Sequence, residues 1–119
     1  GLVAAGEPVN SPAVRKAVEF LLKNQRPNGG WGENYLACVN KAYTEEGTGE
    51  VLGKNGSGVV QTGWALLGLL AGGCEDLSAM KRAKEFLMSR QLPNGDWDQE
   101  GITGVFNRSC GITYTTYRN

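Results

Sequence analysis

The stretch QRPNGGW, residues 25–31, returns as QLPNGDW, residues 91–97, within a chain of 119 residues. Each copy places a glutamine before a Pro-Asn-Gly turn and a tryptophan two residues after the turn glycine. The similarity extends upstream, since seven of the twelve positions in 20–31 and 86–97 are identical. The chain therefore contains an internal repeat, and this repeat is the first guide to its fold.

Amphipathic helices are predicted in front of both motifs. Ser11 and Pro12 provide a capping hydroxyl and a proline suited to the first helical position, and apolar residues follow at helical spacing over 14–22. Pro27 ends this pattern because proline cannot continue the helical hydrogen-bond ladder. A second stripe, over 79–87, follows a start signal between Asp76 and Ser78 and ends at Leu92-Pro93-Asn94-Gly95.

The segment between them, 63–71, is apolar all round and predicts a helix that is buried on every side. Gly63 and Gly68 would each weaken it by about 1 kcal/mol relative to alanine, unless another helix packs closely there. Residues 45–58 hold five glycines without periodicity, so we expect a flexible loop. Because no alternation of period two is sustained, the sequence predicts an all-α fold of stacked helical repeats.

The repeated motif itself is predicted to tie helix ends together. Its glutamine lies at the C-terminal end of a helix, and the turn can bring the tryptophan indole back over the glutamine stem. The glutamine amide then has donors and acceptors for backbone groups that the helix end leaves open. The alternative for either copy is an ordinary turn closed by a tryptophan.

Composition argues against several functions. Twelve basic residues balance twelve acidic ones, so charge predicts neither nucleic acid nor an anionic membrane surface as a partner. No histidine is present, which removes the usual general base and the commonest transition-metal ligand. Asp96 and Asp98 are expected on a polar turn rather than in an acid or metal site. The chain lacks an initiator methionine, and we expect an excerpt of a longer protein.

Two spaced patterns, Gln25-x-x-x-Gly29-x-Trp31 and Gln91-x-x-x-Gly95-x-Trp97, resemble the QW repeats of the triterpene cyclases. The resemblance continues through GWGENY at 30–35, TGWA at 62–65, GVFN at 104–107 and YRN at 117–119. It covers essentially the whole chain and points to the C-terminal catalytic domain of oxidosqualene cyclases of the lanosterol and cycloartenol synthase type. The implied fold is part of an (α/α) barrel, with 1–119 as a fragment of that domain and QW repeats near 20–31 and 86–97.

The resemblance also implies a chemistry. Such enzymes convert 2,3-oxidosqualene to a tetracyclic sterol precursor, lanosterol or cycloartenol, by protonating the epoxide and guiding a carbocation cascade, without cofactor or metal. Carried over to this chain, Phe106 and Tyr114, the latter in a following helix, are the aromatic residues expected to stabilise the cation. The alternatives are a core aromatic near a helix start for Phe106 and a hydroxyl in a polar network for Tyr114.

The family's proton donor lies in an Asp-Cys-Thr-Ala-Glu motif that these residues do not contain, so we expect the 119 residues alone to be inactive. Family members are monotopic on the endoplasmic reticulum membrane or associate with lipid droplets, and the membrane contact is expected outside this chain. Two other readings stay open. One is a protein prenyltransferase β-like subunit, although that site uses a histidine; the other is a helical-repeat binding module without enzymatic activity.

Overall fold

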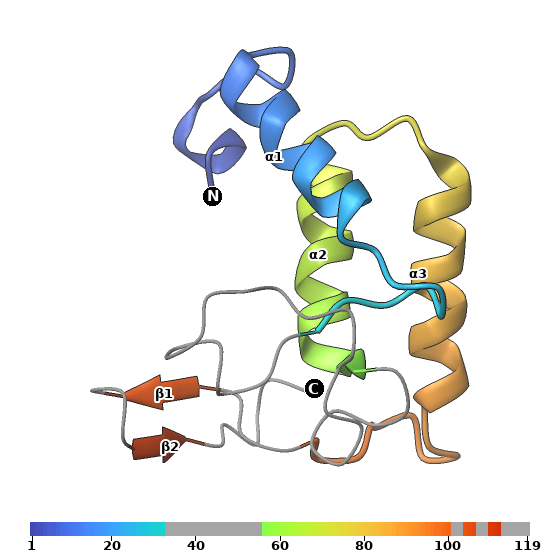
Figure 1. The fold of residues 1–119 in the computed structure, drawn as a ribbon. Coiled ribbons are helices and arrows are strands. Elements are labelled where there is room, and N and C mark those ends of the chain that lie inside the picture. Colours follow the sequence, from blue (N-terminus) through green and yellow to red (C-terminus); the bar gives the residue numbers. More distant parts are fainter. Residues whose placement is uncertain (33–55, 101–103, 107–109, 113–119) are drawn as a thin grey trace.

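The computed structural model describes residues 1–32, 56–100, 104–106 and 110–112 (Figure 1). In chain order the elements are a 3-10 turn η1 at Val3–Ala5, helices α1 at Pro12–Lys23, α2 at Val59–Ala71 and α3 at Leu77–Arg90, and strands β1 at Gly104–Phe106 and β2 at Cys110–Ile112. Helices α2 and α3 lie side by side and run in opposite directions, while α1 crosses the end of α2 (Figure 1).

Helices α1 and α3 follow from their sequence signals, and both predicted helices are confirmed. The Ser11 hydroxyl accepts a hydrogen bond from the Val14 amide at 3.3 Å, with Pro12 at the first helical position. The Asp76 carboxylate does the same for the Ala79 amide at 2.9 Å. Each cap satisfies a backbone donor that the first turn of a helix leaves without a partner.

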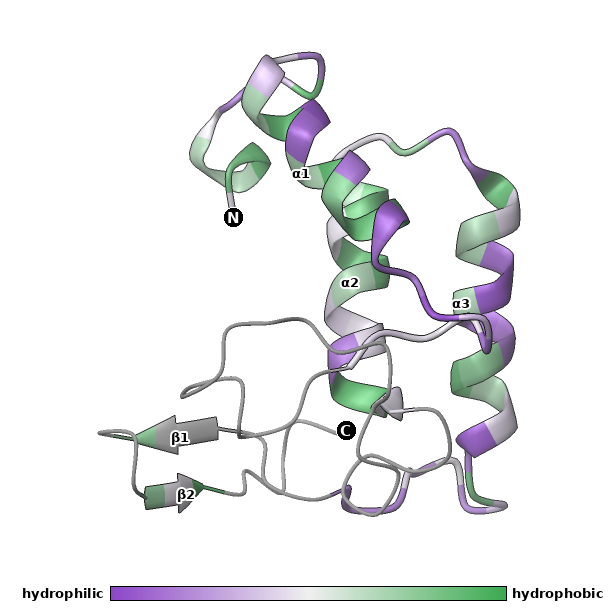
Figure 2. Ribbon diagram, in the orientation of Figure 1, coloured by the Kyte–Doolittle hydropathy of each residue, from purple (hydrophilic) through white to green (hydrophobic). Residues whose placement is uncertain are grey.

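Helix α2 differs from its prediction in two ways. It begins at Val59 rather than Gly63, and the expectation of burial on every side is wrong within this chain. Ala65 and Leu69 are buried, but the outward side chains of α2 are largely exposed: Trp64 55%, Leu67 65% and Leu70 58%. In Figure 2, α2 is green or white over most of its length, whereas α1 and α3 alternate between green and purple. An all-round apolar helix has more apolar faces than α1 and α3 can cover.

The core lies where the three helices meet the first motif. Val18 of α1, Leu69 of α2 and Ala83 of α3 are buried together with Trp31, and Ala65 completes the cluster. Half-buried side chains pack around it, namely Leu21, Leu22, Leu66, Cys74 and Met80. Trp31 thus places a residue from a turn at the centre of a helical core.

The two glycines of α2 have different surroundings. A Cβ atom at Gly68 would lie 3.3 Å from the Leu21 Cδ1 atom of α1, so the expected close helix approach is confirmed there. A Cβ atom at Gly63 would meet none of the described residues within 4 Å. The crossing of α1 over α2 therefore explains Gly68, and the described part of the chain gives Gly63 no packing role.

The predicted helical fold class is confirmed, because the described structure is mostly helical, and one short sheet adds to it. Strands β1 and β2 form a two-stranded antiparallel sheet in which Gly104 pairs with Ile112 and Phe106 with Cys110. Each strand has three residues, which is too short for a period-two pattern to be recognised in the sequence. The strands lie apart from the helices in Figure 1.

The expected flexible loop over 45–58 falls mainly outside the described residues. Its last three residues, 56–58, are buried, so the expectation is wrong for them. The Gly58 amide donates to the Trp31 carbonyl at 2.9 Å, and Ser57 is fully buried. These residues fix the entry into α2 beside the first motif.

Thr62 connects α2 to the backbone of Trp31. Its hydroxyl accepts from the Trp31 amide at 3.0 Å and lies 3.3 Å from the Trp31 carbonyl oxygen, to which it can donate. The Thr62 side chain is fully buried. Because a buried amide without a partner is costly, this one hydroxyl holds the motif and the helix in register.

We predict that Thr62→Val in the intact protein lowers the free energy of unfolding by about 1–3 kcal/mol, because valine keeps the shape but leaves the Trp31 amide unsatisfied. Thr62→Ser keeps the hydroxyl and loses one methyl group, for which we expect a loss of about 1 kcal/mol. Urea unfolding of the two variants measures both values. Equal or smaller destabilisation by valine would contradict the role of this hydroxyl.

Candidate functional site

The two repeated stretches, which we call motif 1 (25–31) and motif 2 (91–97), form the same hydrogen-bonded loop. In motif 1 the Gln25 side-chain amide donates to the Gly29 carbonyl at 2.9 Å. In motif 2 the Gln91 amide donates to the Gly95 carbonyl at 2.8 Å. The turn glycines have φ values of 87° and 89°, a region that side chains disfavour. The two loops therefore share a geometry as well as a sequence.

The backbone and the turn asparagines repeat as well. The residue after each glutamine donates its amide across the turn, from Arg26 to the Gly30 carbonyl at 2.9 Å and from Leu92 to the Asp96 carbonyl at 2.8 Å. Inside each turn the asparagine oxygen accepts a backbone amide at 3.1 Å, from Gly30 in motif 1 and from Asp96 in motif 2. Asparagine is suited to this position because its side chain imitates a backbone turn.

The tryptophans fasten the loops to the helices that precede them. The Trp31 indole donates to the Leu21 carbonyl at 2.8 Å, and the Trp97 indole donates to the Leu87 carbonyl at 2.9 Å. Both carbonyls belong to the last turn of a helix, and the Leu21 carbonyl also accepts from the Asn24 amide at 3.1 Å. The predicted tying of helix ends is confirmed. However, the indole makes this bond, whereas the glutamine was expected to do so.

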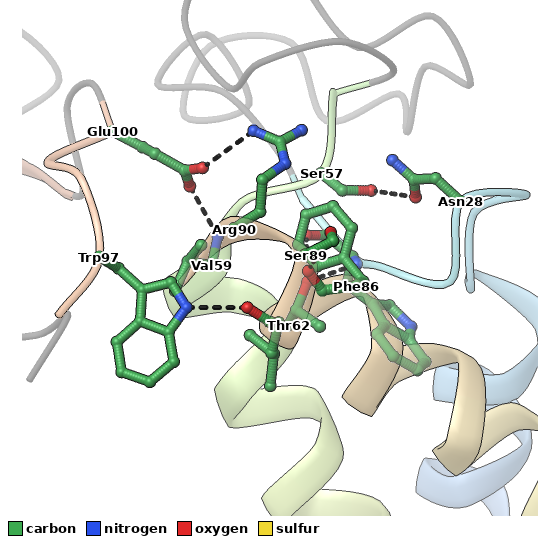
Figure 3. A network of polar contacts seen from close by, with 11 residues as sticks. Asn28, Ser57, Val59, Thr62, Phe86, Ser89, Arg90, Trp97 and Glu100 are labelled. Carbon is green, nitrogen blue, oxygen red and sulfur yellow. Dashed lines mark hydrogen bonds and ion pairs between the residues drawn. The ribbon is translucent and has the colours of Figure 1, made fainter. Parts of the chain in front are cut away.

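Motif 1 has partners that join it to the neighbouring helices. The Gln25 amide also donates to the Ala79 carbonyl of α3 at 2.8 Å, and the Arg82 guanidinium donates to the Gln25 oxygen at 2.6 Å. The Ser57 hydroxyl lies 2.8 Å from the Asn28 side-chain oxygen (Figure 3). Motif 1 is thereby connected to α1, to α3 and to the start of α2.

Motif 2 has the same loop in a more open setting. Its Gln91 is exposed and its Trp97 is half-buried, whereas Gln25 is half-buried and Trp31 is buried. Gln25 is on the side of motif 1 that contacts α3. The same side of motif 2, marked by Gln91, is exposed among the described residues. The difference lies in the surroundings, because the internal bonds of the two motifs agree.

A carboxylate that the sequence did not single out lies beside motif 2. The Glu100 carboxylate accepts from the Val59 amide at 2.6 Å and lies 3.6 Å from the Arg90 guanidinium (Figure 3). Burial raises the pKa of the Glu100 carboxyl above its ordinary value of 4.5, because lost hydration outweighs the Val59 bond and the Arg90 charge, and Asp98 adds repulsion. One signal in the sequence could have indicated such a residue. Gly58 precedes α2 and has no side chain to cap it, so the helix needs an acceptor from elsewhere.

Of the two residues expected to stabilise a cation, the structure describes Phe106 but not Tyr114. Phe106 lies in β1 and is 61% exposed, so the alternative of a core aromatic near a helix start is wrong within this chain. Tyr114, together with the following helix expected to carry it, lies outside the described residues. The catalytic role of both residues stays a prediction.

Other site chemistry can be stated for the described residues alone. Among them, no cluster of three or more histidine, cysteine or acidic side chains is arranged to hold a metal ion. Cys74 and Cys110 are free thiols. None of α1, α2 and α3 combines the length and the apolar character needed to cross a membrane.

The matched turns generate a prediction. A Cβ atom at Gly29 would lie 2.5 Å from the Arg82 carbonyl oxygen, whereas one at Gly95 would meet none of the described residues within 4 Å. Backbone strain alone should cost about 1–2 kcal/mol in either variant. Gly29→Ala should cost about 1–3 kcal/mol more than that strain, since α3 must move. Unfolding of the two variants measures both losses, and a loss in Gly29→Ala no larger than the strain alone would contradict the packing of motif 1 on α3.

Comparison with known proteins gives a consistent result. All of residues 1–119 match the model of the squalene-hopene cyclase C-terminal domain. Lanosterol synthase from Candida albicans is 47% identical over 109 residues, which cover 92% of this chain and 14% of that protein. Lanosterol synthase from Mus musculus is 44% identical over 106 residues, covering 89% of the chain and 13% of the relative.

Cycloartenol synthase from Dictyostelium discoideum is 46% identical over 119 residues, covering 100% of the chain and 16% of the relative. The chain thus spans a small part of the length of each of these proteins. With a family model matched from its first residue to its last, the chain belongs to the squalene-hopene cyclase C-terminal domain family.

Proposed function

We propose that this chain is part of the C-terminal domain of an oxidosqualene cyclase. The whole enzyme would convert 2,3-oxidosqualene to a tetracyclic sterol precursor, lanosterol or cycloartenol. The observation that carries the proposal is the 42–47% identity to lanosterol synthases of Candida albicans, Mus musculus and Homo sapiens over about nine-tenths of the chain. No observation favours a prenyltransferase β-like subunit or a binding module.

For the fold of the whole domain we infer an (α/α) barrel in which motifs 1 and 2 are QW repeats. Motif 1 contacts helix α3, the second helix after it, through Gln25, and the corresponding Gln91 of motif 2 is exposed. Helix α2 carries the outward apolar residues Trp64, Leu67 and Leu70. Both features are expected of a unit that stacks against further helices, because a helical repeat cannot bury its own apolar face.

The chemistry proposed for the site is the stabilisation of a migrating positive charge. An aromatic face attracts a cation and has no lone pair that could trap it, and one such contact contributes about 0.5–2 kcal/mol. At about 1.4 kcal/mol for each factor of ten in rate, one ring can decide a branching ratio. Phe106 has the exposed ring that such a role requires, and Tyr114 is proposed to act with it.

The proton donor, the membrane contact and the location are proposed to belong to the rest of the enzyme. An epoxide must be protonated before the cascade begins, and the motif expected for that step is not among these residues. We infer that the reaction needs neither cofactor nor metal. An endoplasmic reticulum membrane or lipid droplet location, with no nucleic acid partner, fits a substrate that is almost entirely hydrocarbon.

The proposed function is tested by incubating the purified intact protein with 2,3-oxidosqualene and separating products by gas chromatography with mass spectrometry. We expect one dominant tetracyclic alcohol, lanosterol or cycloartenol. The 119 residues alone should form no cyclised product, because they lack the proton donor. A pentacyclic product would contradict the sterol assignment, and the absence of any product from the folded intact protein would contradict the enzyme.

Phe106 generates a sharper prediction. Leucine keeps much of the volume but removes the π face, so Phe106→Leu in the intact enzyme should slow turnover about tenfold and release early-deprotonated or incompletely cyclised products. Phe106→Tyr keeps the face and should retain more of the native product. Product ratios at equal amounts of folded enzyme make the comparison. An unaltered ratio in the leucine variant would assign Phe106 a packing role only.

A further inference from the structure

Helix α2 begins without a side-chain cap from its own turn. Ser11 caps α1 and Asp76 caps α3, but the residue before α2 is Gly58, which has no side chain to accept a hydrogen bond. Uncapped helix ends leave backbone amides without partners and place positive charge at the terminus. The first amide of α2, that of Val59, needs an acceptor from elsewhere in the chain.

Glu100 provides that acceptor from a position far along the sequence. Its Oε2 atom accepts from the Val59 amide at 2.6 Å. A Cβ atom at Gly58 would lie 3.3 Å from the same oxygen and 2.2 Å from the Gln61 side-chain oxygen. A side chain before the helix would therefore displace Gln61 and crowd the Glu100 carboxylate, and glycine leaves room for both.

The Glu100 carboxylate also contacts helix α3, through Arg90. Its Oε1 atom lies 3.6 Å from the Arg90 Nη1 atom, at the C-terminal end of α3. The Arg90 guanidinium stacks 5.2 Å over the ring of Phe86, which is buried in α3 (Figure 3). The Glu100 side chain is only 15% exposed, so both contacts are screened little by water. Glu100 thus joins the start of α2 to the end of α3.

We propose that Glu100 is a positioning residue: by joining the start of α2 to the end of α3, it fixes the point from which the chain continues to Phe106. Strand β1 begins at Gly104, four positions after Glu100, and carries Phe106. A ring that stabilises a cation must keep its place to a fraction of an ångström for the attraction to be useful. The proposal rests on the proposed function, because it assigns Glu100 a role in placing a ring of that site.

The cap itself needs an oxygen that can accept a hydrogen bond. Burial raises the pKa of the Glu100 carboxyl, whereas the Val59 amide and the Arg90 guanidinium lower it and Asp98 raises it. A neutral carboxyl still has an oxygen that accepts from the Val59 amide, and so does the amide of glutamine. Glutamine is therefore the conservative substitution, and alanine removes the acceptor.

The test uses three variants of the intact protein, Glu100→Gln, Glu100→Ala and the control Glu85→Gln. Glu85 lies on the exposed side of α3, where its only described ion pair is with Lys81. The first readout is hydrogen exchange of the amides of Val59 and of 104–106. The second is the product ratio from 2,3-oxidosqualene at a temperature at which each variant is folded.

We expect Glu100→Ala to exchange about fivefold faster at both places, which is the fold-change of a lost cap, and to release more incompletely cyclised product. Glu100→Gln should keep exchange at Val59 near the wild-type value, because its carbonyl oxygen still accepts there. It should restore exchange at 104–106 and the product ratio only in part, because the ion pair with Arg90 is lost. Glu85→Gln should change neither readout. If alanine prevents folding, Glu100→Asp replaces it, because its shorter side chain withdraws the oxygen from Val59 and should give the same two changes.

Unaltered exchange at Val59 would overturn the cap. A second outcome would overturn the positioning role: faster exchange at Val59 while either exchange at 104–106 or the product ratio stays unaltered. Glu100 would then be a stabilising residue only. If the wild-type protein forms no product, the proposed function fails by itself, and exchange at 104–106 then decides alone whether Glu100 holds this strand.

Discussion

The hydrogen bond from the Trp31 indole to the Leu21 carbonyl is the interaction on which the described structure depends. It gives a carbonyl at the end of α1 a second donor, beside the Asn24 amide, and brings a large apolar ring into the core beside Leu69 and Ala83. Once the ring is fixed, its backbone meets Thr62 of α2, and Gln25 reaches α3. One turn therefore sets the relation among three helices, and the corresponding Trp97 bond repeats the device at the end of α3.

This arrangement suits the proposed chemistry. A cavity that guides a cation must keep water and lone pairs away, and it must hold aromatic rings still while the charge moves past them. In the described residues the indole N–H groups of both motifs are bonded to helix carbonyls, and both oxygens of the Glu100 carboxylate are engaged by Val59 and Arg90. These groups hold helices together through atoms that already have partners. The described residues contribute such fastenings, and Phe106 is the ring they are proposed to support.

Sequence reasoning recovered the parts of the fold that local signals determine. Ser11, Asp76 and the two Pro-Asn-Gly turns fix the limits of α1 and α3, because each acts on neighbouring residues. The start of α2 was misplaced because its cap, Glu100, is distant in sequence and only the fold brings it to Val59. Burial around Trp64 was misjudged because an apolar pattern does not say which neighbours exist. Phe106 entered through family resemblance, since nothing local distinguishes it from a core aromatic.

The most direct test of this account removes one N–H group and leaves everything else in place. Benzothienylalanine has the shape of tryptophan with sulfur instead of the indole N–H, and it can be incorporated at position 31 of the intact protein. The account predicts a loss of about 1–3 kcal/mol in the free energy of unfolding, with the α1 end losing protection from hydrogen exchange. Unchanged stability and exchange would show that the ring acts only by filling space, and would contradict the account.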